Sequence, residues 1–403
     1  MKKAYAVIGA NFGDEGKGLM TDYFSRISSE SVLDVRFNGG CQAGHTVVDA
    51  DGKRHVFSHI GAGTFSGADT YLSEFFIVNP MLFMREYEVL NEKYGLSPKV
   101  IISKNAPVTL PCDMLINQLI EKSRGDNRHG SCGMGINETV KRSKNKQFRV
   151  VFGDMSFLEY PRNINSTISK MADIIKNINR FYVPERLAEL GISNPPDEFY
   201  EFINNDNIIY KYIDDFMNMY HICRNFYSDD EVINVYDTVV FEAAQGLLLD
   251  CDRKEYFPNL TPSNTGMKNI RSILDKFPDT DTEICYVTRS YFTRHGAGKF
   301  ISEYSGLAEK YNLSDKTNHT NEYQGSFRYG YFDIDEFKAS IDNERKYFKG
   351  NDKVSLCVTH LDETDSRIIC KDENISAIDL KNLIGADGLY GSYGEIAENV
   401  SVI

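Results

Sequence analysis

The amino-acid sequence predicts an α/β fold, with a mostly parallel central sheet flanked by helices, a P-loop-like nucleotide-binding start and a helical insertion. Three observations lead to this prediction. A short apolar run near the start enters a glycine-rich loop and then a helical pattern. Strand-like apolar runs then alternate with helix-like runs over residues 4–110. Finally, two amphipathic repeats with helical spacing lie between residues of about 155 and 235.

The first predicted element is a strand over Ala4–Ile8, followed by the loop Gly9–Gly18 and a helix. Apolar residues at helical spacing indicate the helix: Leu19, Met20, Tyr23, Phe24 and Ile27. Glycines allow backbone N–H groups to surround an anion, and the helix N-terminus adds its dipole. The loop differs from a Walker A motif, because six residues separate Gly9 from Gly16 and Gly18 stands where Ser or Thr would bind magnesium.

The later elements alternate as expected for a parallel sheet covered by helices. Strands are predicted at the short apolar runs Tyr71–Leu72, Phe75–Val78, Val100–Ile102, Thr238–Phe241, Glu283–Val287 and Val354–Thr359. Helices are predicted at Met81–Tyr94, Ile164–Ile178 and Ile209–Cys223, with a break at Asn194–Asp197. We therefore expect one domain over residues 1–403, with a helical insertion at about 155–235 after which Thr238 resumes the sheet.

Composition limits the classes of function. The chain has 403 residues, and 45 basic against 58 acidic residues give a net charge of −13. This balance argues against binding to nucleic acid or to an anionic membrane surface. The eight cysteines are scattered without a C-x-x-C pair, and no apolar run is long enough to span a bilayer. We expect a cytoplasmic protein with reduced thiols (host cytoplasm if the chain is viral) and no membrane partner.

Four glycine-rich polar clusters follow one another along the chain, at Gly13–Gly18, Asn38–Val48, Phe241–Asp250 and Thr293–Gly298. They read GDEGKG, NGGCQAGHTVV, FEAAQGLLLD and TRHGAG, and a further cluster at Thr359–Asp362 reads THLD. In this order they resemble the motifs of the adenylosuccinate synthetase family, and the resemblance covers most of the chain. It implies a ligase that joins L-aspartate to C6 of a 6-oxopurine nucleotide through a 6-phosphoryl intermediate. The implied substrates are IMP, aspartate and GTP, with Mg²⁺ as cofactor.

The resemblance implies three catalytic residues. Asp14 matches the family's general base, which removes the N1 proton so that O6 becomes nucleophilic, and Asp14 and Gly44 match ligands of Mg²⁺. His45 matches an acid that stabilises charge on O6 and on the transferring phosphoryl group. Lys17 matches a cation that neutralises γ-phosphate charge. Considered singly, Asp14 suggests a helix cap, His45 a structural histidine and Lys17 a surface lysine, and the surrounding motifs favour the catalytic roles.

The resemblance also implies which groups hold the substrates. Arg142 matches an arginine that reaches the substrate phosphate from a partner subunit, which implies a homodimer, and its alternative is plain surface charge. Ser131 is expected to replace Cys132 as the phosphate donor, because a thiol donates poorly. The predicted nucleotide- and substrate-binding residues are Gly13, Glu15, Gly16, Gly18, Asn38, Gln42, Gly44, Thr46, Ser131, Cys132, Arg142, Gln245, Thr261, His295, Thr320, Asn321, Gln324, Arg328, His360, Asp362, Ser392 and Gly394.

The loop that matches the family's aspartate-binding segment departs from its pattern. The family carries consecutive arginines there, whereas residues 317–330 contain one, Arg328. A dicarboxylate favours bidentate guanidinium partners, so Thr320, Asn321 and Gln324 are expected to supply the missing contacts together with Arg328. The depleted loop also favours an alternative function, a purine-nucleotide sensor without catalysis.

Two further alternatives concern the substrates and the reaction. Gly325 stands where the family has an arginine near the ribose hydroxyls, and His295 stands where it has a valine near the sugar. Both changes weaken the case for recognition of a 2′-hydroxyl, which leaves a deoxynucleotide possible as substrate. The alternative reaction is that of some bacteriophage relatives, in which dGMP, aspartate and ATP or dATP give 2-amino-2′-deoxyadenylosuccinate. For the phosphate donor, Asp362 suits the guanine base of GTP, whereas His360 leaves ATP open as an alternative donor. A GTPase or nucleotide kinase is disfavoured by Gly18 and by the cluster around His45.

Overall fold

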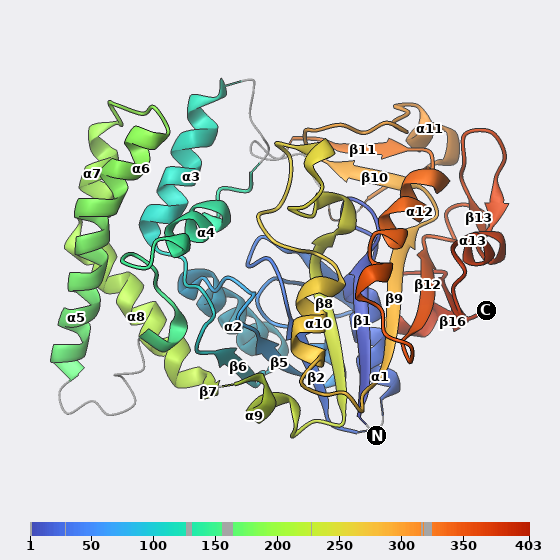
Figure 1. Cartoon of the computed structure of the whole chain (residues 1–403), viewed down its shortest axis with the longest axis horizontal. Helices are drawn as coiled ribbons and strands as arrows, with labels where there is room; N and C mark the ends of the chain where they lie inside the picture. Colours follow the sequence, from blue (N-terminus) through green and yellow to red (C-terminus); the bar gives the residue numbers. More distant parts are fainter. Residues whose placement is uncertain are drawn as a thin grey trace.

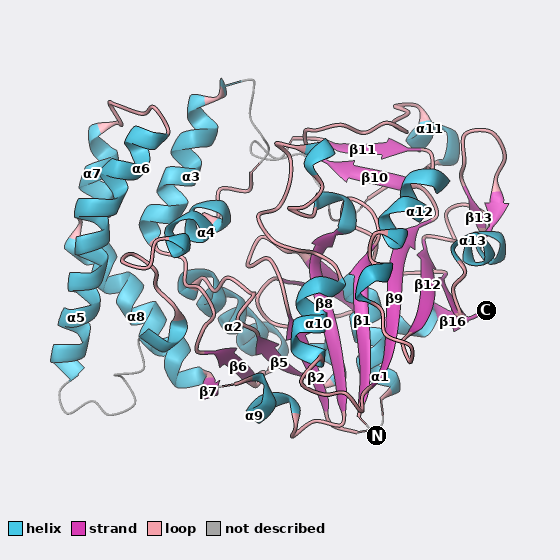
Figure 2. Ribbon diagram, in the orientation of Figure 1, coloured by secondary structure: helices cyan, strands magenta, loops and turns pink. Residues whose placement is uncertain are grey.

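The structure is a computed structural model that describes residues 2–28, 30–125, 131–154, 164–226, 228–315, 317 and 325–403. In these residues a ten-stranded sheet has the order β16-β15-β12-β9-β1-β8-β2-β5-β6-β7 (Figures 1 and 2). Its neighbouring strands are parallel except for the antiparallel pair β15 and β16. The predicted fold class, a mostly parallel sheet flanked by helices, is confirmed.

The strands of this sheet, in chain order, are β1 (Lys3–Gly9), β2 (Val32–Arg36), β5 (Asp69–Leu72), β6 (Val100–Ser103), β7 (Arg224–Phe226), β8 (Thr238–Gly246), β9 (Asp281–Arg289), β12 (Lys353–Thr359), β15 (Gly388–Ser392) and β16 (Val400–Val402). Three small antiparallel pairs accompany it: β3 (His45–Val48) with β4 (Arg54–Phe57), β10 (Phe292–His295) with β11 (Phe327–Gly330), and β13 (Arg367–Ile368) with β14 (Ile375–Ser376).

The helices are α1 (Lys17–Ile27), α2 (Pro80–Tyr94), α3 (Pro111–Ser123), α4 (Ile136–Lys144), α5 (Ile164–Asn177), α6 (Val183–Glu189), α7 (Asp197–Ile203), α8 (Asp206–Ile222), α9 (Asp229–Ile233), α10 (Met267–Leu274), α11 (Leu307–Tyr311), α12 (Ile334–Asp342) and α13 (Ala377–Ile384). A π-helical turn, η4 (Ile178–Tyr182), joins α5 to α6. None of the described helices combines the length and the apolarity needed to cross a membrane.

Strand β1 shows why the sheet is buried on both faces. Its side chains alternate, so that Ala4, Ala6 and Ile8 join one core while Tyr5 and Val7 join another. The first core includes apolar residues of α10, α12 and α13, and the second includes Leu19, Met20 and Phe24 of α1. Layers of helices on both faces exclude solvent from a parallel sheet.

The helices α3 to α8 lie together at one end of the molecule, beside the edge formed by β6 and β7 (Figure 1). They share a separate hydrophobic core with α2, in which Ile116, Met171, Leu187 and Phe216 are buried. Helices α5 and α8 match the two predicted amphipathic repeats closely. The sheet resumes earlier than expected, because the short edge strand β7 already pairs with β6 before β8 begins.

One predicted strand, Phe75–Val78, is wrong. Ser73 and Phe76 form a turn instead, and Ile77 and Val78 make single bridges to Gly40 and Val108. The apolar run is buried against the segments around Gly40 and Val108 and does not belong to the sheet. Asn79 and Pro80 then begin α2, with the Asn79 side chain accepting from the Leu82 N–H at 3.3 Å.

Candidate functional site

The glycine-rich loop after β1 is organised around the carboxylate of Glu15. Its Oε1 accepts from the N–H groups of Asn11 (3.1 Å) and Gly13 (2.8 Å), and its Oε2 accepts from Lys17 Nζ at 2.5 Å. A Cβ at Gly9 would come within 2.3 Å of Glu15 Oε2, so this position requires glycine. Burial acts to raise the pKa of Glu15, but Lys17 and the amide donors outweigh it and hold that pKa below its usual value.

A cavity of about 1220 Å³ opens beside this loop. It lies where the loops after several parallel strands meet, which is the usual place for ligands in such sheets. The predicted residues that line it are Gly13, Asp14, Gly16, Lys17, Gly18, Gln42, Gly44, His45, Thr46, Ser131, Cys132, Gln245, Thr261, His295, His360, Asp362, Ser392 and Gly394. The structure therefore brings together residues from all the motifs that the sequence singled out.

Asp14 is half-buried at the mouth of the loop with a backbone φ of +61°, a left-handed conformation. Its carbonyl oxygen accepts a hydrogen bond from Arg289 Nε, which fixes this backbone. Among the described residues no donor is bound to its carboxylate, which faces the cavity. An unengaged carboxylate beside a phosphate loop is available to accept a proton or to bind a cation.

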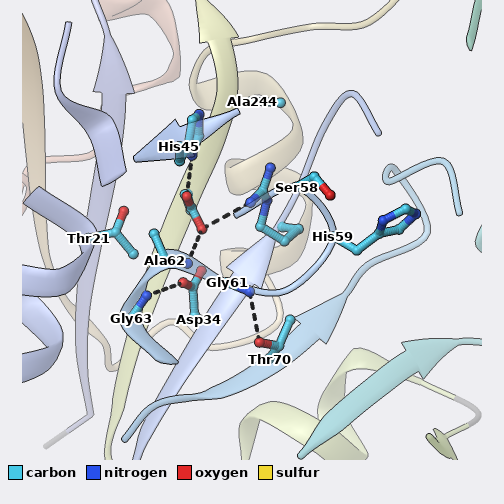
Figure 3. Close-up of polar contacts among 12 residues, drawn as sticks. Thr21, Asp34, His45, Ser58, His59, Gly61, Ala62, Gly63, Thr70 and Ala244 are labelled. Carbon is cyan, nitrogen blue, oxygen red and sulfur yellow. Dashed lines mark hydrogen bonds and ion pairs between the residues drawn. The ribbon is translucent and has the colours of Figure 1, made fainter. Parts of the chain in front are cut away.

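His45 begins β3 and is 7% exposed. Its Nδ1 is hydrogen-bonded to Oε1 of Glu242 in β8, while its buried Nε2 has no partner among the described residues (Figure 3). Glu242 Oε2 accepts from the Ala62 N–H at 3.0 Å and lies 3.3 Å from Arg36 Nη1. Burial acts to raise the pKa of Glu242, but Arg36 and His45 lower it to about 2. Glu242 therefore orients His45 as a carboxylate.

Arg142 lies where neither expectation placed it. Its side chain is 0% exposed, and its guanidinium donates to Asp113 (2.8 Å), Val108 O (2.6 Å) and Phe148 O (2.9 Å). It is neither surface charge nor free to reach a partner subunit's site, because every nitrogen is engaged within its own chain. The prediction of a partner-directed Arg142 is therefore wrong.

Three other predicted residues lie outside the cavity lining. Glu15 is enclosed in the loop itself, and Asn38 is fully buried, where its Oδ1 accepts from the Ala244 N–H at 2.8 Å. Arg328 donates to Glu303 and to the carbonyls of Gly296 (3.0 Å) and Gly298 (2.9 Å), so its guanidinium is already engaged. Three more predicted residues, Thr320, Asn321 and Gln324, fall outside the described residues.

Sequence reasoning missed several cationic side chains that line the cavity: Arg54, Arg124, Lys141, Arg186, Arg289 and Arg294. Arg289 ends β9, and its position at the carboxyl end of a strand next to β1 was a usable signal. Arg294 stands within the TRHGAG motif, 2% exposed, with its guanidinium carbon 4.3 Å from the ring centroid of Phe12. Burial, assisted by Arg328, lowers the pKa of Arg294 to about 10.

The position of Arg142 leads to a stability prediction. Replacing Arg142 with alanine is expected to lower the free energy of unfolding by about 3–5 kcal/mol, because Asp113 would remain as an unpaired buried charge. Urea unfolding measures this loss. Lys144→Ala, an exposed change on the same helix, is the matched control and should stay within about 0.5 kcal/mol of the parent. A stable Arg142→Ala protein with weakened nucleotide binding would restore a substrate role.

Comparison with known proteins agrees with this geometry. The family model of adenylosuccinate synthetase matches residues 6–368. The chain belongs to the adenylosuccinate synthetase family. The adenylosuccinate synthetase of Clostridium beijerinckii is 33% identical over 313 residues, which cover 75% of this chain and 66% of that relative. The Buchnera aphidicola relative is 28% identical over 372 residues, which cover 91% of this chain and 78% of that relative.

Two solved structures share the fold. Fully ligated adenylosuccinate synthetase from Plasmodium falciparum has a TM-score of 0.72 at 18% identity, with both chains covered completely. The succinoaminodeoxyadenylate synthetase of cyanophage S-2L, bound to dGMP and dATP, has a TM-score of 0.61 at 13% identity, covering 100% of this chain and 95% of that one. Against the C. beijerinckii and Mycoplasma mycoides relatives, the match spans 66% and 64% of their length.

Proposed function

We propose that the protein is an adenylosuccinate-synthetase-type ligase that converts IMP, L-aspartate and GTP to adenylosuccinate, GDP and phosphate. One observation carries the proposal. The Asp14 carboxylate and His45 Nε2 have no hydrogen-bond partners among the described residues, and both side chains line the same cavity as Lys17 and the phosphate loop. Family membership adds independent support.

The reaction needs a base at N1 of the purine and an acid at its C6 oxygen. The C6 oxygen of a purine is a poor leaving group, so it must be phosphorylated before an amine displaces it. Asp14 would accept the N1 proton, which makes O6 nucleophilic toward the γ-phosphate. His45 donates from Nδ1 to the Glu242 carboxylate, and in its imidazolium form it would also donate from Nε2 to the negative charge that builds on O6 and on the phosphoryl group. Lys17 would neutralise γ-phosphate charge.

The residues present fit a magnesium ion. Mg²⁺ prefers hard oxygen ligands and usually takes one or two protein ligands with substrate phosphates and waters completing its shell. The Asp14 carboxylate, without a bound donor among the described residues, and the Gly44 carbonyl lie on the cavity wall with Lys17. These two groups would hold the ion, and the bound ion would supply charge neutralisation to the triphosphate.

A second candidate reaction uses dGMP and ATP or dATP in place of IMP and GTP. The observation that favours it is Gly325, a residue without a side chain at a φ of +83°, in the segment expected near the ribose. Arg328, three residues later, is bound to Glu303 and two carbonyls and so does not replace a ribose contact. The cyanophage protein of similar fold is bound to dGMP and dATP.

Aspartate recognition and assembly complete the proposal. Thr320, Asn321 and Gln324 stay predicted aspartate contacts, while Arg294 on the cavity wall, whose Nε has no partner among the described residues, offers a guanidinium group. A homodimer is proposed without a contribution from Arg142, and the cytoplasmic location stays a prediction.

A substrate matrix tests the function. Purified protein is incubated with IMP, dIMP, GMP or dGMP, each with GTP, ATP or dATP, in the presence of Mg²⁺ and with or without aspartate. The expected result is phosphate release that requires aspartate, with a succinyl-purine product and highest kcat/KM for IMP with GTP. Preference for dGMP would establish the second candidate. Binding without turnover would favour a sensor, and aspartate-independent phosphate release a simple NTPase.

A further inference from the structure

Two buried carboxyl groups, Asp34 and Glu242, lie on adjacent parallel strands behind His45. In the register of β2 and β8, Asp34 is opposite Val240 and Arg36 is opposite Glu242. Residues two apart on a strand point to the same face, so Asp34, Arg36 and Glu242 share one side of the sheet. Asp34, Arg36 and Glu242 are each 0% exposed.

Consecutive backbone amides hold these two carboxyl groups next to each other. The Ala62 N–H donates to Glu242 Oε2 at 3.0 Å, and the Gly63 N–H donates to Asp34 Oδ2 at 3.1 Å (Figure 3). A Cβ at Gly61 would lie 2.3 Å from Asp34 Oδ2, so glycine at this position lets the backbone come close to the carboxyl group. The loop is therefore shaped around both acids.

The charges do not balance if both acids are ionised. Arg36 lies 3.3 Å from Glu242, whereas burial lowers the pKa of His45 and so favours its neutral form, and Lys17 is paired with Glu15. Glu242 and Arg36 are the charged groups that act most strongly on Asp34. Its Oδ1 is buried and has no donor among the described residues. Burial and the negative Glu242 raise the pKa of Asp34 well above its usual value.

A proton on Asp34 resolves this conflict. Two ionised carboxylates have no hydrogen to share, whereas a protonated Oδ1 becomes a donor directed at the neighbouring Glu242. Glu242 keeps its negative charge because Arg36 and His45 stabilise it, so the proton belongs on Asp34. One neutral acid, one carboxylate and one guanidinium then carry no net charge, and the buried Asp34 Oδ1 gains a partner.

We propose that Asp34 is a positioning residue for His45, because its neutral carboxyl group donates from Oδ1 to Glu242 and so fixes the carboxylate that holds His45 Nδ1. The proton stays on Asp34 throughout, and no bond forms or breaks. The network holds the imidazole in one orientation at the cavity wall. This inference rests on the proposed function of His45.

Three variants separate positioning from packing. Asp34→Asn keeps an acceptor for the Gly63 N–H and a donor for Glu242, so it should retain kcat within about threefold of the parent. Asp34→Leu removes the donor and should lower kcat by about 10- to 100-fold with KM little changed. Thr70→Val is the matched control, because Thr70 lies opposite Asp34 in the register of β2 and β5 and its Oγ1 accepts from the Gly61 N–H of the same loop. Its kcat should stay within about twofold. Equal losses in Asp34→Asn and Asp34→Leu would overturn the proposal.

A second measurement does not depend on turnover. At neutral pH, infrared difference spectra between the parent and Asp34→Asn should contain the carbonyl stretch of a protonated carboxylic acid. The pH dependence of the free energy of unfolding also reports whether Asp34 is protonated. The folded state holds a proton that the unfolded chain releases above about pH 4, so this group's contribution to stability falls as pH rises from there. Asp34→Asn lacks this loss and should gain stability relative to the parent between about pH 4 and pH 8.

The outcomes remain distinguishable. If the parent forms no succinyl-purine with any substrate pair, the proposed function fails, while the infrared and unfolding data still decide whether Asp34 is protonated. A missing acid band, or a stability difference between parent and Asp34→Asn that is independent of pH, overturns the inference. Circular dichroism verifies that Asp34→Leu is folded, and the Asp34→Asn arms decide the question if it is not.

Discussion

Asp14→Asn is expected to lower kcat by about 10³-fold or more while the protein stays folded. Asparagine preserves the size of the side chain but cannot accept the N1 proton, so O6 of the purine stays a weak nucleophile. The Asp14 carboxylate holds no hydrogen bond to the described residues, and its replacement therefore disturbs little packing. Steady-state turnover with the preferred substrate pair measures the loss, and circular dichroism monitors the fold.

A carboxylate elsewhere on the same wall provides the control for Asp14. Glu189 in α6 lines the helical side of the cavity and is exposed, with Arg186 as its ion-pair partner at 2.9 Å. Glu189→Gln removes the same charge and should change kcat by less than about threefold. Equal losses in the two variants would show that the cavity needs negative charge in general and not a base at Asp14.

His45→Gln is expected to lower kcat by about 10²- to 10³-fold. Glutamine can still donate to Glu242 but does not supply the imidazole Nε2 at the cavity wall. The loss should appear in kcat with the KM values for both nucleotides changed little, because the lost interaction belongs to the transition state. Rapid-quench measurement of γ-phosphate loss in a single turnover would locate the effect in phosphoryl transfer.

The matched control for His45 stands on the same hairpin. His55 in β4 is opposite Val47 of β3, lies 3.8 Å from Glu86, and is not among the residues that line the cavity. His55→Gln should leave kcat within about threefold. If both histidine variants lost activity together, the hairpin's structure and not the His45 imidazole would explain the effect.

The sequence predicted the sheet and the motif loops because both depend on local patterns. The apolar run of β1 and the helical spacing in α1 depend on neighbours within one element. The loops after parallel strands meet at one edge of the sheet, so motifs far apart in the chain could be assigned to a common site. Asp14, Lys17 and His45 were assigned from the resemblance of their motifs to the family, and all three line the cavity.

The contacts that escaped prediction depend on pairing across the fold. Asp113 neutralises Arg142 from a different helix, and Glu303 occupies Arg328 from a distant loop. The residues next to either arginine in the sequence do not indicate which acid it pairs with. The pairing of Asp34 with Glu242 also arises only when β2 and β8 become neighbours, although they are about 200 residues apart in the chain. Single-sequence patterns indicate which side chains are polar, but not which polar groups satisfy one another.

The Glu15 carboxylate in the phosphate loop has a consequence for how nucleotide is captured. Glu15 already occupies two amides and the Lys17 ammonium, and so serves as an internal counter-anion that holds the cradle in shape before any nucleotide arrives. Capture then requires little ordering of the chain. It does require that an incoming phosphate share Lys17 with the Glu15 carboxylate, which makes affinity depend on the other cationic side chains that line the cavity.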